Sequence, residues 1–460
     1  MAVMDPDPTC EDHGRPTRLA CAECGRPICP DCSVRTEVGF RCDRHGKAVT
    51  RRRLGPTRRS PASVVVPLVV VAVVVVGLVR SRPFDAGEPA RPPCPSAPAP
   101  DVGLGPQSGG SSWSDMGPSG LCGRFHAATA WTGREMVVWG GASCAGAQCP
   151  ADDAPRVGDG AAWSAETRSW RPLASSPLAG RDAAVSVWTG DQLLVWGGRR
   201  PEGLLADGAA YHPASDGWQE LPEGPLGPRE FAQADWTGTE MVVWSGGGGD
   251  GRMPTDGAAY SPGSRSWRRL ATSLIAGRAL AATAWTGREL LVWGGVDVDG
   301  NGLGDGAAYD PAADTWRALA PSPLTPRYRP VTAWTGREML VWGGAGDDNL
   351  FVDGAAYDPA TDSWRALAAS PLAARDGAAT AWTGRDLLVW GGFGRDDLLA
   401  DGARYTPEAD AWVRLPAVEL TERGLAAGAW TGREFLVWGG IVLPPTGSYA
   451  SAADGAAYRG

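Results

Sequence analysis

The sequence predicts an all-β fold made of seven copies of one four-stranded unit, preceded by an N-terminal region of different composition. Three observations lead to this prediction. Trp is abundant (22 residues) and Gly reaches 64, whereas Phe (7) and Tyr (8) are scarce, which is typical of a repeated short motif. The Trp residues recur at fixed spacings after residue 110. Residues 1–60 hold 12 basic and 8 acidic side chains, a net charge of +4, so this region differs from the rest. The whole chain has a net charge of −9, and this negative charge argues against a nucleic-acid partner.

Cysteine and histidine residues occur in pairs near the N-terminus. The four pairs, each with two intervening residues, are Cys10/His13, Cys21/Cys24, Cys29/Cys32 and Cys42/His45. Four thiolate or imidazole ligands complete a closed tetrahedral zinc site, so eight ligands predict two zinc ions. Residues 1–46 are too short to bury a large core, and metal binding would supply the folding energy. Reduced thiols without metal are the alternative.

The order of these pairs resembles the B-box type of zinc-binding domain over residues 10–45. The resemblance implies a cross-braced arrangement, in which one zinc ion is held by Cys10, His13, Cys29 and Cys32, and the other by Cys21, Cys24, Cys42 and His45. The last pair departs from the usual order, in which His ligands cluster near the end. Both sites are full, so we expect a structural module that docks a cytoplasmic protein partner.

Residues 62–79 form a run of 18 uncharged residues, which as a helix would be about 27 Å long, near the thickness of a bilayer core. A buried strand is the alternative, but the run is too long for a strand. Basic residues concentrate before it, in the juxtamembrane segment 47–61. The positive-inside bias therefore predicts a single-pass plasma membrane protein with a cytoplasmic N-terminus. Residues 80–110, rich in Pro, Ala and Gly, form a semi-extended linker.

The rest of the chain, residues 111–460, is one repeat. Trp-Thr-Gly begins seven copies, at Trp131, Trp188, Trp236, Trp285, Trp334, Trp382 and Trp430. Eight residues later stands a second Trp, followed in six copies by Gly-Gly, then an Asp-Gly-Ala motif and, in six copies, a third Trp eleven residues after that Asp. Apolar runs between turn signals predict four strands, a to d, in each copy. Four strands at a period of about 48 residues indicate a β-propeller blade.

The double glycine, followed by an aromatic residue and then a Trp, resembles the kelch repeat. The resemblance covers roughly residues 111–460 and implies a seven-bladed kelch-like propeller. The seventh copy lacks strand d at its C-terminal end. However, Trp113 precedes Arg124 by eleven residues, the offset that separates Trp364 from Arg375. We therefore expect strand 111–115 to complete the last blade and close the ring.

The connections between strands b and c vary in length, so binding is expected on the face that they share with the d–a loops. The longest are Ala142–Gly158 and Ile441–Ala453. Seven arginines open the inner strands on this face: Arg124, Arg181, Arg229, Arg278, Arg327, Arg375 and Arg423. Either they ring the mouth of the channel and bind an anionic ligand, or each pairs with a strand-c Asp and ties neighbouring blades together. The Trp side chains are expected in the core.

One b–c loop has the spacing of a calcium site. Asp297, Asp299, Asn301 and Asp305 place oxygen atoms at positions 1, 3, 5 and 9, with Gly302 at position 6, and calcium prefers such hard ligands. The stretch looks like the calcium hairpin loops of integrin α-subunit propellers. It lacks an acidic residue at position 12, where Ala308 stands. A calcium site and a plain turn both remain open.

Four cysteines follow the predicted membrane span, namely Cys94, Cys122, Cys144 and Cys149. They suit two disulfides in an oxidising space, and three pairings are open. A Cys144–Cys149 bond would pin the longest b–c loop, and a Cys94–Cys122 bond would fasten the linker to the first blade.

These features predict a membrane-anchored binding or signalling protein rather than an enzyme. Its propeller would bind an extracytoplasmic protein or glycan. The alternative is a propeller enzyme of the oxidase, sialidase or epimerase type. A kelch-type copper oxidase would need two His ligands, whereas the propeller holds only His126 and His212, and His212 lies in a c–d turn on the other face. No Ser-x-Asp-x-Gly sialidase motif is visible, although fold alone does not decide function.

Overall fold

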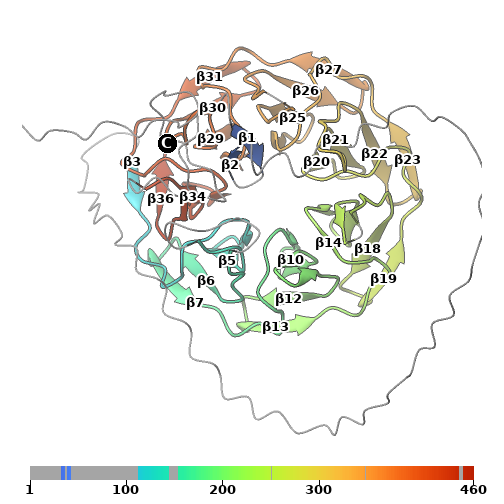
Figure 1. Ribbon diagram of the computed structural model, residues 1–460, viewed down its shortest axis with the longest axis horizontal. Helices are drawn as coiled ribbons and strands as arrows, with labels where there is room; N and C mark the ends of the chain where they lie inside the picture. The colour runs from blue at the N-terminus through green and yellow to red at the C-terminus, as the bar shows by residue number, and fades with distance from the viewer. Residues whose placement is uncertain are drawn as a thin grey trace, which may run out of the picture.

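The computed structural model describes residues 112–144, 154–249, 251–347, 349–444 and 449–460, together with two short strands nearer the N-terminus. These two, β1 (Ser33–Thr36) and β2 (Gly39–Cys42), form an antiparallel hairpin. The rest of the described chain forms seven four-stranded antiparallel sheets, which Figure 1 shows as blades around a central axis. The predicted all-β, seven-bladed propeller is therefore confirmed.

In every blade the strands run from a, nearest the axis, to d at the periphery (Figure 1). Blade one contains β4 (Ala128–Trp131), β5 (Glu135–Trp139), β6 (Gly160–Ser164) and β7 (Ser169–Pro172). Blade two contains β8 (Val185–Trp188), β9 (Leu193–Trp196), β12 (Gly208–His212) and β13 (Gly217–Glu220). Blade three contains β15 (Gln233–Trp236), β16 (Met241–Trp244), β18 (Gly257–Ser261) and β19 (Ser266–Arg269).

The remaining blades repeat this arrangement. Blade four contains β20 (Ala282–Trp285), β21 (Leu290–Trp293), β22 (Gly306–Asp310) and β23 (Thr315–Ala318). Blade five contains β24 (Val331–Trp334), β25 (Met339–Trp342), β26 (Gly354–Asp358) and β27 (Ser363–Ala366). Blade six contains β28 (Ala379–Trp382), β29 (Leu387–Trp390), β30 (Gly402–Thr406) and β31 (Ala411–Arg414). Blade seven contains β32 (Ala427–Trp430), β33 (Phe435–Trp438), β36 (Gly455–Arg459) and β3 (Ser112–Asp115).

Short two-stranded ladders extend three blades on the b–c side. They pair β10 (Arg199–Arg200) with β11 (Gly203–Leu204), β14 (Arg229–Glu230) with β17 (Gly247–Gly248), and β34 (Ile441–Val442) with β35 (Ala450–Ser451). Figure 1 places β10, β14 and β34 on the inner side of the ring. The b–c and d–a connections therefore meet near the axis.

The N-terminal strand closes the ring. β3 pairs antiparallel with β36, and Trp113 stands opposite Tyr458. The two strands lie side by side in Figure 1, where the first colours of the propeller meet the last. This is the arrangement that the spacing between Trp113 and Arg124 predicts. Because strand d of the last blade comes from the start of the propeller, no sheet edge is left open at the seam.

Strand b carries the core of every blade. A neighbouring blade covers each of its two faces, so the strand is buried throughout and reads as a continuous apolar run such as Leu290–Trp293. Its Trp contacts the strand-d Trp of the next blade at each of the seven seams, with ring centroids 5.2–6.0 Å apart; the pairs are 139/218, 196/267, 244/316, 293/364, 342/412, 390/113 and 438/170. The strand-b Trp side chains are therefore core, as predicted. Most strand-d Trp and all Trp of the Trp-Thr-Gly motifs are half-buried, so the prediction that every Trp set is core holds in full for strand b alone.

A polar network reinforces four seams at the periphery. At the seam between blades three and four, Arg268 binds Glu240 of its own blade at 2.6 Å and donates to the Tyr309 hydroxyl of the next blade at 3.0 Å. Tyr309 donates in turn to Asp314, which accepts a hydrogen bond from the backbone N–H of Ala271 in blade three. Equivalent Arg–Glu–Tyr–Asp sets occupy the seams one/two, four/five and five/six, built on Arg171, Arg317 and Arg365.

No helix within the described part of the chain is long and apolar enough to span a membrane. The span predicted over residues 62–79 lies outside the described residues, as do the basic segment 47–61 and the linker 80–110. Of the predicted zinc module, residues 1–46, only the backbone of β1 and β2 is described.

Candidate functional site at the mouth of the channel

Each of the seven predicted arginines binds the Asp that precedes strand c in its own blade. The nearest nitrogen–oxygen distances are 2.8–3.1 Å, in the pairs 124/159, 181/207, 229/256, 278/305, 327/353, 375/401 and 423/454. All seven arginines are at most 2% exposed. The geometry therefore agrees with the paired interpretation and not with a ring of open guanidinium groups that binds an anionic ligand.

The ion pair does not join neighbouring blades, which corrects one part of the prediction. Arg278 and Asp305 both belong to blade four. The link between blades comes from the backbone, because a double glycine or its equivalent donates to the carbonyl oxygen of the next blade's arginine at every seam. Sequence spacing shows that Arg and Asp recur together, but it does not show which of their atoms reaches the adjacent sheet.

The two residues after each arginine form the innermost layer of this face. The first pairs with the residue that follows the double glycine of the same blade, as Asp182 does with Arg199. The second has a positive φ of 48–61° in all seven blades; these residues, here called the mouth residues, are His126, Ala183, Phe231, Leu280, Arg329, Gly377 and Leu425. Six are not glycine, so the fold holds side chains in a backbone region that usually costs energy and that tends to occur at functional sites.

Hydrogen bonds connect neighbouring mouth residues. The backbone N–H of Phe231 donates to Ala183 at 3.0 Å, and that of Arg329 donates to Leu280 at 2.8 Å. A third bond joins blades six and seven in the same way. The mouth residues thus follow one another around the axis, on a frame that the buried Arg–Asp pairs fix.

Charged side chains from blades one to three meet at the mouth. Asp182 is buried, and its carboxylate lies 2.8 Å from Nε of Arg156 and 3.2 Å from Nε of Arg199. Arg199 also binds Glu230 at 3.2 Å. His126 completes the group, with Nδ1 3.7 Å from the Asp182 carboxylate, beyond hydrogen-bond distance.

Aromatic rings cover this charged group. The ring of His126 contacts Phe231 edge-on, with centroids 5.1 Å apart and planes at 83°. Phe125 lies against His126 at 5.2 Å, and the guanidinium of Arg199 lies 5.5 Å from the centre of the Phe231 ring. Because blades one and three are not neighbours, the contact between His126 and Phe231 shows that mouth side chains reach past the intervening blade.

Burial and charge set the protonation of the group. Burial lowers the pKa of His126 below its ordinary range, although the Asp182 carboxylate acts in the opposite direction. Burial alone would raise the pKa of Asp182, but His126 and the charges of Arg199 and Arg156 outweigh it, and the pKa lies well below its usual range. The imidazole is therefore neutral and the carboxylate ionised near neutral pH.

A second charged pair lies across blades five and six. Nη1 of Arg329 is 3.6 Å from the Asp376 carboxylate, whereas Nε and Nη2 of Arg329 are buried and have no hydrogen-bond partner among the described residues. Two aromatic residues flank this pair. Tyr328 precedes Arg329 and forms a β-bridge with Ala345 in blade five, and Phe393 forms a β-bridge with Asp376 in blade six. The mouth thus presents acidic, basic and aromatic groups at positions that differ from blade to blade.

The propeller matches a known protein family. Residues 125–323 and 237–440 match the KLHDC2/KLHL20/DRC7 Kelch-repeats domain, and these matches together cover more than half of the chain. The chain belongs to the kelch-repeat family. A second match assigns residues 5–37 to the B-box zinc finger. A search of curated proteins finds no match to this chain.

The N-terminal module is thus a B-box zinc finger, which binds zinc. Its donor set fits the metal, because Cys and His at two-residue spacing are the ligands of structural zinc sites. The matched segment contains six of the eight predicted ligands: Cys10, His13, Cys21, Cys24, Cys29 and Cys32. Cys42 and His45 follow it. The side chains of all eight lie outside the part that the structure describes.

The calcium prediction finds no support in the kelch propeller. The Asp305 carboxylate binds Arg278, and that of Asp297 accepts hydrogen bonds from the backbone N–H groups of Asp299 and Asn301 at 2.9 and 2.8 Å. In the described parts of the chain, no group of three or more His, Cys, Asp or Glu side chains could hold a metal ion. These hydrogen bonds fit a turn capped by Asp297, the other interpretation that the sequence allows.

Two of the four outer cysteines lie within the described residues. Cys122 and Cys144 are each disulfide-bonded. Cys94 and Cys149 lie outside the described residues, so the two predicted bonds, Cys94–Cys122 and Cys144–Cys149, stay predictions. Cys144 also fixes the seam, since its backbone exchanges hydrogen bonds with Ser451 of blade seven.

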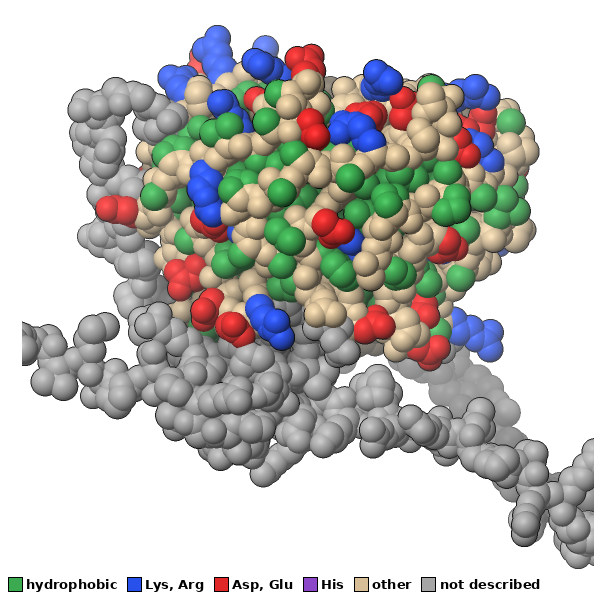
Figure 2. Space-filling view, turned by 90° about the horizontal axis from the view of Figure 1, so that it is seen from above, with side chains coloured by type: hydrophobic (Ala, Val, Ile, Leu, Met, Phe, Trp, Pro, Cys, Tyr) green, Lys and Arg blue, Asp and Glu red, His purple; other side chains and the backbone are tan. Residues whose placement is uncertain are grey.

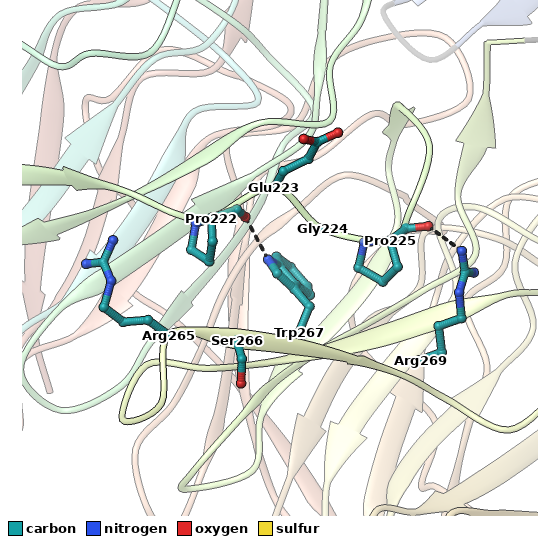
Figure 3. A pocket seen from close by; sticks show the side chains of 8 residues that line it. All are labelled: Pro222, Glu223, Gly224, Pro225, Arg265, Ser266, Trp267 and Arg269. Carbon is teal, nitrogen blue, oxygen red and sulfur yellow. Dashed lines mark hydrogen bonds between the residues drawn. The ribbon is translucent and has the colours of Figure 1, made fainter.

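A shallow pocket of about 560 Å³ lies on the outer wall, between blades two and three (Figure 3). Pro222 and Pro225 line one side, and their carbonyl groups accept hydrogen bonds from Trp267 and Arg269. This seam lacks the peripheral polar network, because Gln219 and Gln192 replace its Arg and Glu. The pocket lies beside strand d of blade three and is separate from the mouth.

Sequence reasoning missed the mouth residues. It placed binding in the b–c and d–a loops but selected the constant arginines, which are buried in ion pairs. A signal for the mouth residues was present, because the two positions after each arginine differ among the seven copies while the arginine does not. Side chains that vary on a fixed backbone are those that a repeat protein uses for recognition.

Proposed function

We propose that the protein is a membrane-anchored binding protein whose kelch propeller binds an extracytoplasmic protein or glycan through the mouth of the channel. The B-box module docks a protein partner in the cytoplasm. Kelch propellers and B-box domains are both protein-interaction modules, and this chain joins one of each. The apolar run at residues 62–79 between them supports an anchor.

The observation that carries the proposal is the contrast between Arg and the two residues after it. The arginine is buried and paired in all seven blades. The next two positions, in contrast, bring together His126, Asp182 and Phe231 on one side of the axis and Arg329 on the other. Such a surface offers charged hydrogen-bonding groups and aromatic contacts, the groups enriched at binding hot spots.

A binding role is favoured over catalysis by the surroundings of the two propeller histidines. His126 is enclosed by Phe125, Phe231 and Asp182, and its Nδ1 atom has no hydrogen-bond partner among the described residues. His212 ends β12, at the c–d turn. The two imidazoles belong to opposite ends of the blades, so they do not form a shared metal or acid–base site.

Affinity capture with the full-length chain in detergent tests the proposal. Envelope proteins and glycans retained by the chain are identified by mass spectrometry, and the dissociation constant of each is then measured for two variants. Phe231→Ala and Tyr328→Ala should each weaken binding at least about tenfold, the effect of removing one interface hot spot. Glu408→Ala, an exposed change in a c–d turn, is the matched control. Retention that is equal in all three variants would contradict the mouth as the binding surface.

A further inference from the structure

The face opposite the mouth carries an arc of exposed arginines. Thr-Gly-Arg turns join strands a and b in five consecutive blades, four to seven and then one; the arginines are Arg288, Arg337, Arg385, Arg433 and Arg134, all exposed. Blades two and three carry Asp191 and Thr239 at this position. In side view, Figure 2 shows basic side chains projecting along the upper rim of the propeller, with acidic side chains among them.

Each of these arginines projects from a rigid turn. In blade seven the Thr431 hydroxyl accepts hydrogen bonds from the backbone N–H groups of Arg433 and Glu434, at 3.2 and 2.8 Å. The N–H of Thr431 donates to the Glu434 carbonyl at 2.9 Å, which closes the turn. The same bonds recur in the other four turns of the arc. The guanidinium groups are therefore presented from fixed positions at one end of the blades.

The acidic residue after each arginine does not cancel the charge of the arc. Glu135 binds Arg171 at 2.6 Å, and Glu434 binds Arg168 at 3.4 Å. These carboxylates are thus neutralised by arginines from the outer half of the blades. Asp386 is the exception, because its carboxylate accepts a hydrogen bond from the Thr406 hydroxyl and, among the described residues, forms no ion pair.

The arc divides into a paired and an unpaired part. Arg288 binds Asp310 at 3.3 Å and Arg337 binds Asp358 at 3.1 Å, each within its own blade. Among the described residues, no carboxylate lies within ion-pair distance of the side chains of the other three, Arg385, Arg433 and Arg134. These three belong to blades six, seven and one. The c–d turns of blades six and one place the exposed carboxylates Glu408 and Glu166 at the same end, so blade seven is where an unpaired arginine has no acidic c–d turn beside it.

Blade seven is also where the chain from the N-terminal region joins the propeller. Ser112 at the start of β3 stands opposite Arg459, and Phe435 at the end of the Arg433 turn stands opposite Tyr458. The chain therefore arrives at the same end of the same blade as the centre of the unpaired arginines. In blade seven, strand c (β36) and strand d (β3) are not joined by a c–d turn. In other blades that turn carries acidic residues such as Asp314.

We propose that Arg385, Arg433 and Arg134 dock the propeller on the anionic phospholipid headgroups of the bilayer. This inference rests on the membrane anchor of the proposed function, because the linker 80–110 leads from the predicted span to this face. An arginine near an anionic bilayer surface strengthens binding about fivefold, so three supply roughly a hundredfold. The tether makes docking intramolecular, at an effective concentration on the order of millimolar, so this modest attraction suffices. Docking turns the channel mouth away from the membrane.

The full-length chain in nanodiscs tests the proposal. One set of nanodiscs contains phosphatidylcholine alone and the other a mixture with phosphatidylglycerol. Phenylglyoxal modifies accessible arginines, and mass spectrometry gives the rate at each site. Modification of Arg385, Arg433 and Arg134 should be several-fold slower in the anionic nanodiscs. Arg395, exposed in the b–c loop of blade six, is the internal control and should react equally in both. High salt should remove the difference, because it screens surface charge.

The outcomes separate the docking surface from the anchor. Equal rates for the three arginines in both nanodiscs, or slowing that includes Arg395, would overturn docking and leave the anchor intact. Protection by added polyphosphate in neutral nanodiscs, without protection by anionic lipid, would also overturn it in favour of a soluble polyanion. A chain that does not stay with nanodiscs would disprove the anchor. Docking is then measured by cosedimentation with phosphatidylglycerol vesicles, where R134A/R385A/R433A should bind at least about tenfold more weakly than R395A; equal binding would reject it.

Discussion

The carbonyl oxygen of Arg278 accepts a hydrogen bond from the backbone N–H of Gly246 at 3.0 Å. Gly246 belongs to blade three, whereas the guanidinium of Arg278 binds Asp305 and the Gly294 carbonyl within blade four. One residue therefore organises its own blade through its side chain and contacts the preceding blade through its backbone. Repeated seven times, this arrangement makes the mouth of the channel a rigid frame for the side chains that vary.

Arg278→Ala should destabilise the propeller by about 2–3 kcal/mol, because it removes the buried donors to Gly294 and Asp305. The cost should not reach the upper range for buried pairs, since the Asp305 side chain is 55% exposed and water can reach the carboxylate that remains. Thermal unfolding measures the loss. The control is Arg288→Ala, whose side chain is 81% exposed and which should change stability by less than about 0.5 kcal/mol. Equal melting temperatures for both variants would contradict the structural role.

Trp113→Ala should cost about 3–5 kcal/mol, the usual range for truncating a buried aromatic residue. Trp113 is 8% exposed, contacts Trp390 and Tyr458, and donates to the Pro416 carbonyl at 3.1 Å. Removing it weakens both the closing strand and the seam with blade six. Val413→Ala, on the outer strand of blade six and 50% exposed, provides the control. If both variants unfold at the same temperature, β3 does not hold the ring closed.

The sequence was sufficient to predict the repeat and its closure because both rest on spacings between the same residues. The offset from Trp113 to Arg124 equals that in complete blades, and β3 pairs with β36 accordingly. The partner of each arginine could also be predicted, since Asp precedes strand c in every copy. The direction of the link between blades could not, because it depends on backbone atoms that no residue type marks.

The mouth could be predicted only as a region. Loop lengths point to the b–c and d–a face, but the contact of His126 with Phe231 joins residues from blades that are not adjacent. Such a contact follows from the curvature of the ring, which spacing does not give. The peripheral network shows the opposite case. Arg268 and Glu240 occur together in the units that form it and are both replaced in blade two, so covariation among the copies carries the signal.

The zinc content of the N-terminal module should depend on the ligands within and beyond the B-box match. Two zinc ions per chain are expected from eight ligands, and Cys24→Ser should lower the content toward one. Cys42→Ser should have the same effect if the fourth pair completes the second site, although Cys42 lies outside the matched residues 5–37. Metal analysis of the purified chain measures both, with Ser33→Ala as the control. Unchanged zinc in Cys42→Ser would remove the fourth pair from the ligand set.

Two glycines of blade four separate backbone strain from steric exclusion. Gly295 and Gly287 have similar positive φ angles, 99° and 91°. A Cβ atom on Gly295 would lie 2.7 Å from the Ala279 carbonyl oxygen, whereas one on Gly287 would meet nothing within 4 Å. Gly287→Ala should therefore cost only backbone strain, about 1 kcal/mol. Gly295→Ala should cost at least about 2 kcal/mol more, because the backbone at Ala279 must shift to make room for the Cβ atom. Chemical denaturation compares them, and equal losses would exclude a role for close approach.

Acid should destabilise the mouth through His126. Burial lowers its pKa in the folded protein, whereas the unfolded imidazole titrates near its ordinary value of about 6.5. As the pH falls below that value, the unfolded state binds a proton that the folded state does not, so stability decreases until the pH passes the folded pKa. The slope contributed by this residue can reach about 1.4 kcal/mol per pH unit.

His126→Phe removes this titration. The unfolding free energy of the variant minus that of the unaltered protein should therefore increase as the pH falls from 7 to 5. Asp182 does not obscure the effect, because the stability that its depressed pKa provides is lost only below about pH 5, as the pH falls from the ordinary Asp pKa of about 3.9 toward the folded value. A difference that is constant across this interval would show that His126 titrates as freely in the folded protein as in the unfolded chain.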